Sequence, residues 1–174
     1  MPLEFAVGHA TRTGKRERNE DFVGAVTPEA DDLAARGALL AVADGVSGEG
    51  AGREAAEYAV RGLLADYYAT PETWEVPQAV DRVLSAINRW MMGQGAVDKT
   101  RAGMATTLSL LVLRGNRYTI GHVGDTRVYR LRSHEMSLLT QDHVWETLAR
   151  RVIWRRSCLR ETKRLHKAIS TRRA

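Results

Sequence analysis

Four short acidic motifs follow one another along the chain. They occupy residues 16–21, 44–45, 124–127 and 140–143. The first three place a carboxylate beside a run of residues that is typical of a β-strand. Carboxylate oxygens are the ligands that hard divalent cations such as Mg²⁺ and Mn²⁺ prefer. The motifs therefore predict an all-oxygen metal site built at strand ends.

Asp44-Gly45 is the strongest of these motifs. Asp44 ends a continuous apolar run, residues 38–43, where a carboxylate is costly unless it is paired or bound to a cation. Gly45 lets the backbone approach closely, so its carbonyl oxygen can serve as a further ligand. A plain Asp-Gly turn is the alternative interpretation.

Glu20 and Asp21 stand where a polar loop enters a strand. Because successive side chains of a strand point to opposite faces, one of the two is expected to face a metal and the other to support it indirectly. An ordinary exposed acidic pair would look the same in the sequence. Asp125, in the motif Gly124-Asp125-Thr126-Arg127, lies in a turn between two strands, which a simple hairpin explains nearly as well.

Arg16 lies five residues before Asp21. Its guanidinium is a planar fork that matches two phosphate oxygens, so it is a candidate phosphate ligand. Arg12 and Arg18 compete for this role, and each can equally be a solvated loop charge. The histidines show no metal-ligand spacing and are interpreted as core or surface residues.

In this order, the four motifs resemble the metal-dependent PPM (PP2C-type) serine/threonine protein phosphatases of bacteria. Residues 103–107, Gly-Met-Ala-Thr-Thr, also resemble a segment of that family, with a structural role expected for them. The resemblance implies two bound Mn²⁺ or Mg²⁺ ions and a third, weaker one. It also implies hydrolysis of phosphoserine and phosphothreonine by a metal-activated water, with phosphorylated proteins as substrates and a cognate protein kinase as a further partner.

The family's site roles carry over to particular residues of this chain. Glu20 would bind a metal with Asp21 in support, Asp44 would bridge two metals, and the Gly45 carbonyl would bind one of them. Asp125 would help to bind the third metal, and Arg16 would hold the phosphate. Arg16 and Asp44 are thus the expected catalytic residues. Where relatives carry a His after Asp-Gly as a candidate proton donor, this chain has Val46.

The elements that must position these residues follow from hydrophobic periodicity. Helices are expected over residues 53–68 and 76–92, the second stopped by Gly93 and Gly95. Residues 28–32 are expected to form a loop. Strands are expected over residues 5–10, 21–26, 38–43, 105–113, 118–123, 128–131 and 137–139. This order predicts an α+β fold, and the resemblance specifies an antiparallel β-sandwich flanked by helices in α-β-β-α layers, here incomplete.

Charge divides the chain into two parts. Residues 1–145 hold 16 Lys and Arg against 19 Asp and Glu, a net charge of −3, whereas residues 146–174 hold 10 against 2, a net charge of +8. The resemblance implies a partial phosphatase domain over residues 1–145, and the negative net charge of this part predicts that it does not bind nucleic acid. Residues 146–174 form a basic tail, interpreted as a solvated helix with Leu148, Val152, Leu159 and Leu165 on one face, or as a frameshifted, non-native end.

The bulk composition fits one cytoplasmic domain. The only cysteine, Cys158, excludes an intrachain disulfide, and no apolar run approaches the length of a membrane span or a signal peptide.

Two further metal-binding aspartates of the family lie beyond the fourth motif, and this chain has no Asp after Asp142. Three interpretations follow: a phosphatase whose activity is impaired or needs ligands from another chain, an inactive truncated product, and a non-catalytic module that binds phosphoproteins.

Overall fold

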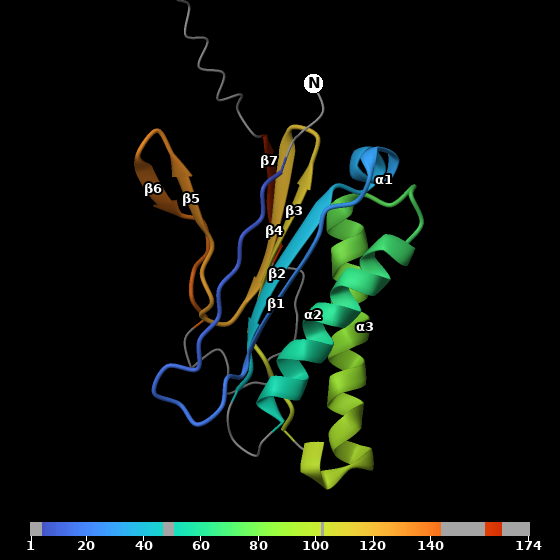
Figure 1. Ribbon diagram of the computed structural model, residues 1–174. Helices are drawn as coiled ribbons and strands as arrows, with labels where there is room; N and C mark the ends of the chain where they lie inside the picture. Colours follow the sequence, from blue (N-terminus) through green and yellow to red (C-terminus); the bar gives the residue numbers. More distant parts are fainter. Residues whose placement is uncertain (1–4, 47–50, 102, 144–158, 165–174) are drawn as a thin grey trace, which may run out of the picture.

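The structure is a computed structural model that describes residues 5–46, 51–101, 103–143 and 159–164 (Figure 1). Its seven strands are all paired in antiparallel fashion. They are β1 Asp21–Val26, β2 Ala38–Asp44, β3 Leu108–Arg114, β4 Arg117–Val123, β5 Tyr129–Arg132, β6 Glu135–Leu138 and β7 Leu159–Arg164. The helices are α1 Ala30–Ala35, α2 Gly52–Ala69 and α3 Val76–Val97, with a short 3₁₀ turn, η1, at Lys99–Arg101.

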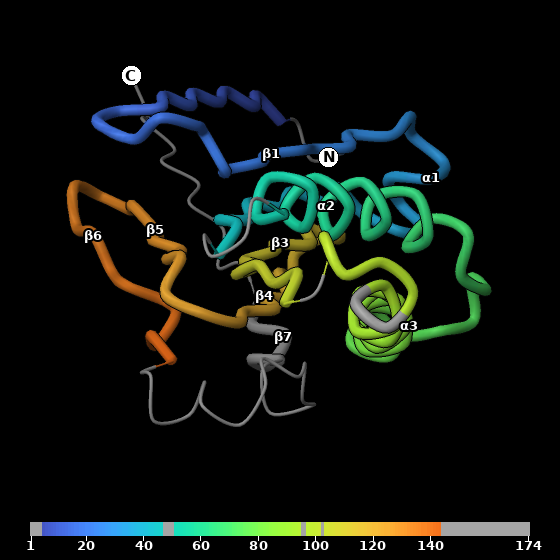
Figure 2. Tube along the Cα trace, turned by 90° about the horizontal axis from the view of Figure 1, so that it is seen from below, coloured from blue at the N-terminus to red at the C-terminus, as the bar shows by residue number. Residues whose placement is uncertain are grey.

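Five strands form the main sheet in the order β1-β2-β3-β4-β7, and β5 and β6 form a separate hairpin. Helices α2 and α3 lie against one face of the main sheet, and the hairpin lies on the other side (Figures 1 and 2). The sequence prediction of an α+β fold, with antiparallel sheet covered by a helical layer, is confirmed.

The core lies between the helices and the sheet. Alternation along β2 decides which side chains enter it: Leu39, Ala41 and Ala43 are buried, whereas Val42 and Asp44 point to the other face and are exposed. Helix α2 contributes a buried stripe that includes Val60, Leu63 and Tyr67.

The face of the sheet away from the helices, which we call the open face, is more accessible. The β5–β6 hairpin beside it carries Tyr129 opposite Leu138 and Leu131 opposite Met136, so one side of the hairpin is wholly apolar. Leu131 and Met136 are 72% and 68% exposed.

Three local predictions are wrong. Residues 5–10 form no strand; they are mostly exposed, with Val7 45% exposed, so little buried surface offsets the entropy of ordering them. Residues 30–35 form helix α1 where a loop was predicted, since Asp31 and Asp32 in its first turn favour the positive end of the helix dipole. Helix α3 continues through Gly93 to Val97, because a glycine costs a helix only about 1 kcal/mol.

The basic tail is described only in part. Residues 159–164 form strand β7 at the edge of the main sheet, with Arg164 opposite Arg117, and not part of a helix. A chain that can donate backbone hydrogen bonds to the free edge of β4 is stabilised there whatever its side-chain pattern. The remaining residues of the predicted tail helix, including Leu148, Val152 and Leu165, lie outside the described residues, as does Cys158.

No helix in the described part of the chain is both long and apolar enough to cross a bilayer.

Candidate metal centre

Asp21 and Asp44 form the centre of the site. They lie directly opposite each other in the register of β1 and β2, at the beginning of one strand and the end of the other. Residues directly opposite in a sheet share a face, and their β-carbons lie about 4.5–5.5 Å apart. Like charges at this spacing repel, so the pair favours a cation between or beside the two carboxylates.

The electrostatics of Asp44 identify its neighbours. The residue is exposed overall, yet partial burial of its carboxyl group raises the pKa of Asp44 above its ordinary value. The carboxylates of Asp21, Asp125 and, more weakly, Glu20 raise this pKa further, and the positive charge of Arg16 lowers it. The structure thus brings residues of two other predicted motifs, 16–21 and 124–127, close to Asp44.

Glu20 approaches from a different direction. Its Oε1 lies 3.1 Å from the point where a β-carbon on Gly52 would stand, at the beginning of α2. The positive end of an 18-residue helix favours a carboxylate there. Among the carboxylates that raise the pKa of Asp44, Asp21 has the largest effect and Glu20 the smallest.

Gly45 is required by close packing. A β-carbon on this residue would lie 2.1 Å from the carbonyl oxygen of Gly52, which no side chain can occupy. The Gly45 N–H donates to the Glu20 carbonyl oxygen at 3.2 Å. The Asp-Gly motif therefore ties the end of β2 to both the first motif and the start of α2.

Two threonines hold the backbone of Asp44. The Asp44 N–H donates to Thr107 Oγ1 at 3.0 Å, and the Thr107 N–H donates to the Asp44 carbonyl oxygen at 2.9 Å. Thr106 Oγ1 donates to the same carbonyl oxygen at 2.9 Å. The segment 103–107, for which the sequence predicted a structural role, thus fixes the backbone that carries the central carboxylate.

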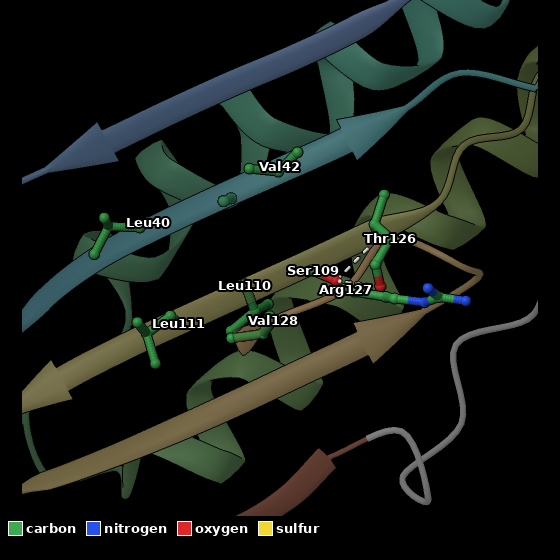
Figure 3. A pocket seen from close by; sticks show the side chains of 9 residues that line it. Leu40, Val42, Ser109, Leu110, Leu111, Thr126, Arg127 and Val128 are labelled. Atoms are coloured by element: carbon green, nitrogen blue, oxygen red, sulfur yellow. Dashed lines mark hydrogen bonds between the residues drawn. The ribbon is translucent and has the colours of Figure 1, made fainter. Parts of the chain in front are cut away.

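The loop that carries Asp125 is held on both sides of that residue. Before it, Gly124 has a φ of +103° and donates its N–H to His143 Nδ1 at 3.2 Å. After it, Ser109 Oγ lies 2.9 Å from Thr126 Oγ1 (Figure 3). Hydrogen bonds from Arg127, the shortest of them 2.5 Å, lower the pKa of Asp142 and fasten the end of the loop.

His122 is a buried part of the same support. It is 4% exposed, and its Nδ1 lies 2.9 Å from Ser109 Oγ. Its Nε2 has no hydrogen-bond partner among the described residues. Burial is the main reason why the pKa of His122 is lowered, so the ring is held neutral. The interpretation of His122 as a core residue agrees with this.

Sequence reasoning missed the roles of Arg53 and Ser109. The Arg53 guanidinium donates to the Asp21 carbonyl oxygen and lies 5.0 Å from the centre of the Phe22 ring. The contact of Ser109 depends on strand register, because Ser109 faces the Asp125 loop only where it stands opposite His122 in the pairing of β3 with β4. The contacts of Arg53 depend on the packing of α2 beside β1. No spacing in the sequence reports this.

A cavity of about 380 Å³ opens beside the central pair on the open face. Its lining includes Asp21, Val42, Asp44 and Thr126, together with residues 8–11 of the N-terminal segment. The carboxylates therefore have room for a small charged ligand beside them.

The donor chemistry fits a divalent cation, since the side chains around Asp44 offer carboxylate oxygens and an excess of negative charge. Within the described residues, however, no three Asp, Glu, His or Cys side chains come together in a group that could hold a metal ion. If these residues hold a metal ion, they would supply only part of its coordination shell.

The comparisons with known proteins agree on one family. A family model described as protein phosphatase 2C matches residues 11–165. The serine/threonine protein phosphatase PstP of Mycobacterium tuberculosis is 34% identical over 112 residues, which are 64% of this chain and 22% of that protein. The serine/threonine phosphatase stp of Listeria monocytogenes is 32% identical over 132 residues, 74% of this chain and 50% of that protein.

A solved structure shows the same fold with metal bound. The catalytic domain of PstP in complex with two manganese ions aligns with a TM-score of 0.61 and 32% identity, covering 76% of this chain and 53% of that chain. The chain thus spans about half the length, or less, of these three relatives.

Proposed function

This chain belongs to the protein phosphatase 2C family, and we propose that it takes part in metal-dependent hydrolysis of phosphoserine and phosphothreonine in proteins. The observation that carries the proposal is the facing pair Asp21 and Asp44 at one end of the sheet, with Asp125 and Arg16 acting on the same carboxylate. The solved relative with two manganese ions supports Mn²⁺, and Mg²⁺ has the same preference for oxygen ligands.

Each side chain has a role that its position supports. Asp44 and Asp21 would hold the cations, with the Gly45 carbonyl as a further ligand, Asp125 at the periphery and Glu20 beside the start of α2. Bound divalent cations supply a water of lowered pKa and neutralise charge on the phosphoryl oxygens. Arg16 would bind two of those oxygens through its planar fork and orient the phosphorus. Val46 offers no proton donor next to Gly45, so protonation of the leaving oxygen would fall to water or to another residue.

We further propose that the 174-residue chain binds its metals weakly by itself. The carboxylates around Asp44 supply only part of a shell, and a two-metal site that lacks carboxylates retains excess positive charge. Full turnover would then need carboxylates from outside these residues. An inactive protein, or a module that uses Arg16 to bind phosphoproteins without hydrolysis, are the competing outcomes. Phosphorylated Ser/Thr proteins and a cognate kinase are the proposed partners, in the cytoplasm.

The test is phosphate release by the purified chain from a phosphothreonine peptide and from p-nitrophenyl phosphate. Each substrate is tested with EDTA and over a series of Mn²⁺ and Mg²⁺ concentrations, beside Asp44→Asn. We expect release that depends on metal, requires unusually high metal concentration and is lost in Asp44→Asn. Peptide binding that Arg16→Ala abolishes, without any release, would favour the binding module. A folded chain with neither property would refute the proposed function.

A further inference from the structure

Thr107 stands between the two carboxylate-bearing segments of the site. It precedes β3 and lies beside the end of β2, and it also contacts the loop that follows β4. One side of it meets Asp44 and the other meets Gly124, the residue before Asp125. Asp44 and Asp125 are 81 positions apart in the sequence, and Thr107 contacts both Asp44 and the residue that precedes Asp125.

The polar side of Thr107 fixes Asp44. Its hydroxyl oxygen accepts the Asp44 N–H, and its own N–H donates to the Asp44 carbonyl oxygen, so both backbone groups of Asp44 are engaged by one residue. The opposite neighbour of Asp44 is Asp21, whose like charge pushes the two strand ends apart. The hydrogen-bond pair therefore holds Asp44 at the point where repulsion acts to separate the strands.

The apolar side of Thr107 fixes the loop. A β-carbon on Gly124 would lie 2.6 Å from both Cβ and Cγ2 of Thr107, so the Gly124 backbone is in direct contact with the threonine methyl group. Gly124 also has a φ of +103°, which few other residues adopt. Its N–H is aimed at His143, so the direction in which the chain enters Asp125 is set by these two contacts.

We propose that Thr107 is a positioning residue that couples Asp44 to Asp125, with the hydroxyl placing one carboxylate and the methyl group placing the other. Thr106 cannot replace it, because its hydroxyl reaches only the Asp44 carbonyl oxygen and the Thr107 carbonyl oxygen. The inference deepens the proposed function, because it assumes that both carboxylates serve one metal centre. The contacts themselves do not depend on that function.

Two substitutions separate the two sides of the residue. Thr107→Val keeps both branches at the β-carbon and removes the oxygen, whereas Thr107→Ser keeps the oxygen and removes the methyl group. Thr27→Val, just beyond the other end of β1, removes a threonine hydroxyl far from the site and is the matched control. Thermal unfolding by circular dichroism checks that all three proteins are folded.

The first measurement is amide hydrogen exchange by NMR in the metal-free protein, which is independent of any phosphatase activity. In Thr107→Val we expect the Asp44 amide to exchange about 5- to 10-fold faster, as for the loss of one hydrogen bond, with the Gly124 amide unchanged. In Thr107→Ser we expect the reverse pattern. Uniform effects on both amides in both variants, or none, would overturn the division of roles.

The second measurement is Mn²⁺ affinity by isothermal titration calorimetry. Residues that orient metal ligands typically change affinity by about 10- to 100-fold, and we expect a loss in that range for each Thr107 variant and none for Thr27→Val. Unchanged affinity in both Thr107 variants would refute coupling. Should wild type bind Mn²⁺ without hydrolysing phosphate, the proposed function fails and this inference stands; should wild type bind no Mn²⁺, the exchange pattern alone decides it.

Discussion

Removal of the central carboxylate should stabilise the metal-free protein. Asp44→Asn keeps the size of the side chain and abolishes repulsion by Asp21, which lies directly opposite, and by Asp125. Cross-strand charge pairs change stability by about 0.2–1 kcal/mol. For a chain of this size that corresponds to a rise in the melting temperature of about 0.5–4 °C. Such a cost is expected if Asp44 serves to bind a cation, because its charge is unfavourable until the cation is bound.

The change in stability caused by Asp44→Asn should depend on pH, and this dependence tests whether charge repulsion is its cause. The pKa of Asp44 is raised in the folded protein, so the folded state binds this proton more tightly than the unfolded chain does. The contribution of Asp44 to stability is therefore fully present below its unfolded pKa and is lost as pH rises through the folded pKa. Asp44→Asn should therefore be more stable than wild type at pH 7.5, and this difference in stability should disappear at pH 3.

The assay is thermal unfolding by circular dichroism in EDTA at several pH values. Asp142→Asn is the control of opposite sign, because hydrogen bonds from Arg127 lower the pKa of Asp142 and its contribution is lost as pH falls through that value. A lower melting temperature for Asp44→Asn at pH 7.5 in EDTA would show that its carboxylate is already compensated within the protein, and the argument for a cation would fail. With saturating Mn²⁺ the order should reverse, since only wild type gains from binding.

Three more substitutions test other parts of the site and its surface. Gly45→Ala should destabilise the protein by about 1–3 kcal/mol, since the Gly52 carbonyl must move to admit the β-carbon; a melting temperature equal to wild type would contradict the packing. Arg16→Ala should weaken binding of inorganic phosphate in the presence of Mn²⁺ by about 10-fold, measured by calorimetry, whereas equal affinity would assign the phosphate to another cation. The double substitution Leu131→Lys and Met136→Lys should lower binding of an apolar dye and slow aggregation measured by light scattering, because both side chains are largely exposed. Unchanged dye binding would show that the dye binds to another apolar surface.

The position of Asp44 at the end of a strand was predictable, because the sequence pattern that indicates it is local. An apolar run that ends in Asp-Gly specifies a strand, its end and a costly carboxylate at once, and β2 ends at Asp44. The helices on one side of the sheet followed in the same way from their periodicity, as the buried stripe of α2 shows. Residues 5–10 failed, because apolar composition alone does not provide a partner strand.

The proximity of Asp125 to Asp44 could not be predicted from the spacing of the two residues in the sequence. It depends on the pairing of β2 with β3 and of β3 with β4, which brings the start of β3 between the two carboxylate segments. The resemblance to a known family placed Asp125 at a metal site, and residue types alone left it a hairpin turn. Thr107 and Ser109 acquire their contacts from the same register, so their importance becomes visible only in three dimensions.

Precision of placement and strength of binding are separate properties of this site. The backbone of Asp44 is held at both its N–H and its carbonyl oxygen, and Gly45 and Gly124 leave no space for a different packing. This support needs nothing beyond the described residues, yet those residues do not gather three metal-ligating side chains into one group. Metal affinity should therefore be low while hydrogen exchange at Asp44 is slow. A protein with both properties has an ordered backbone around Asp44 but an incomplete set of metal ligands. Added carboxylate ligands would then raise its metal affinity without first having to order the site.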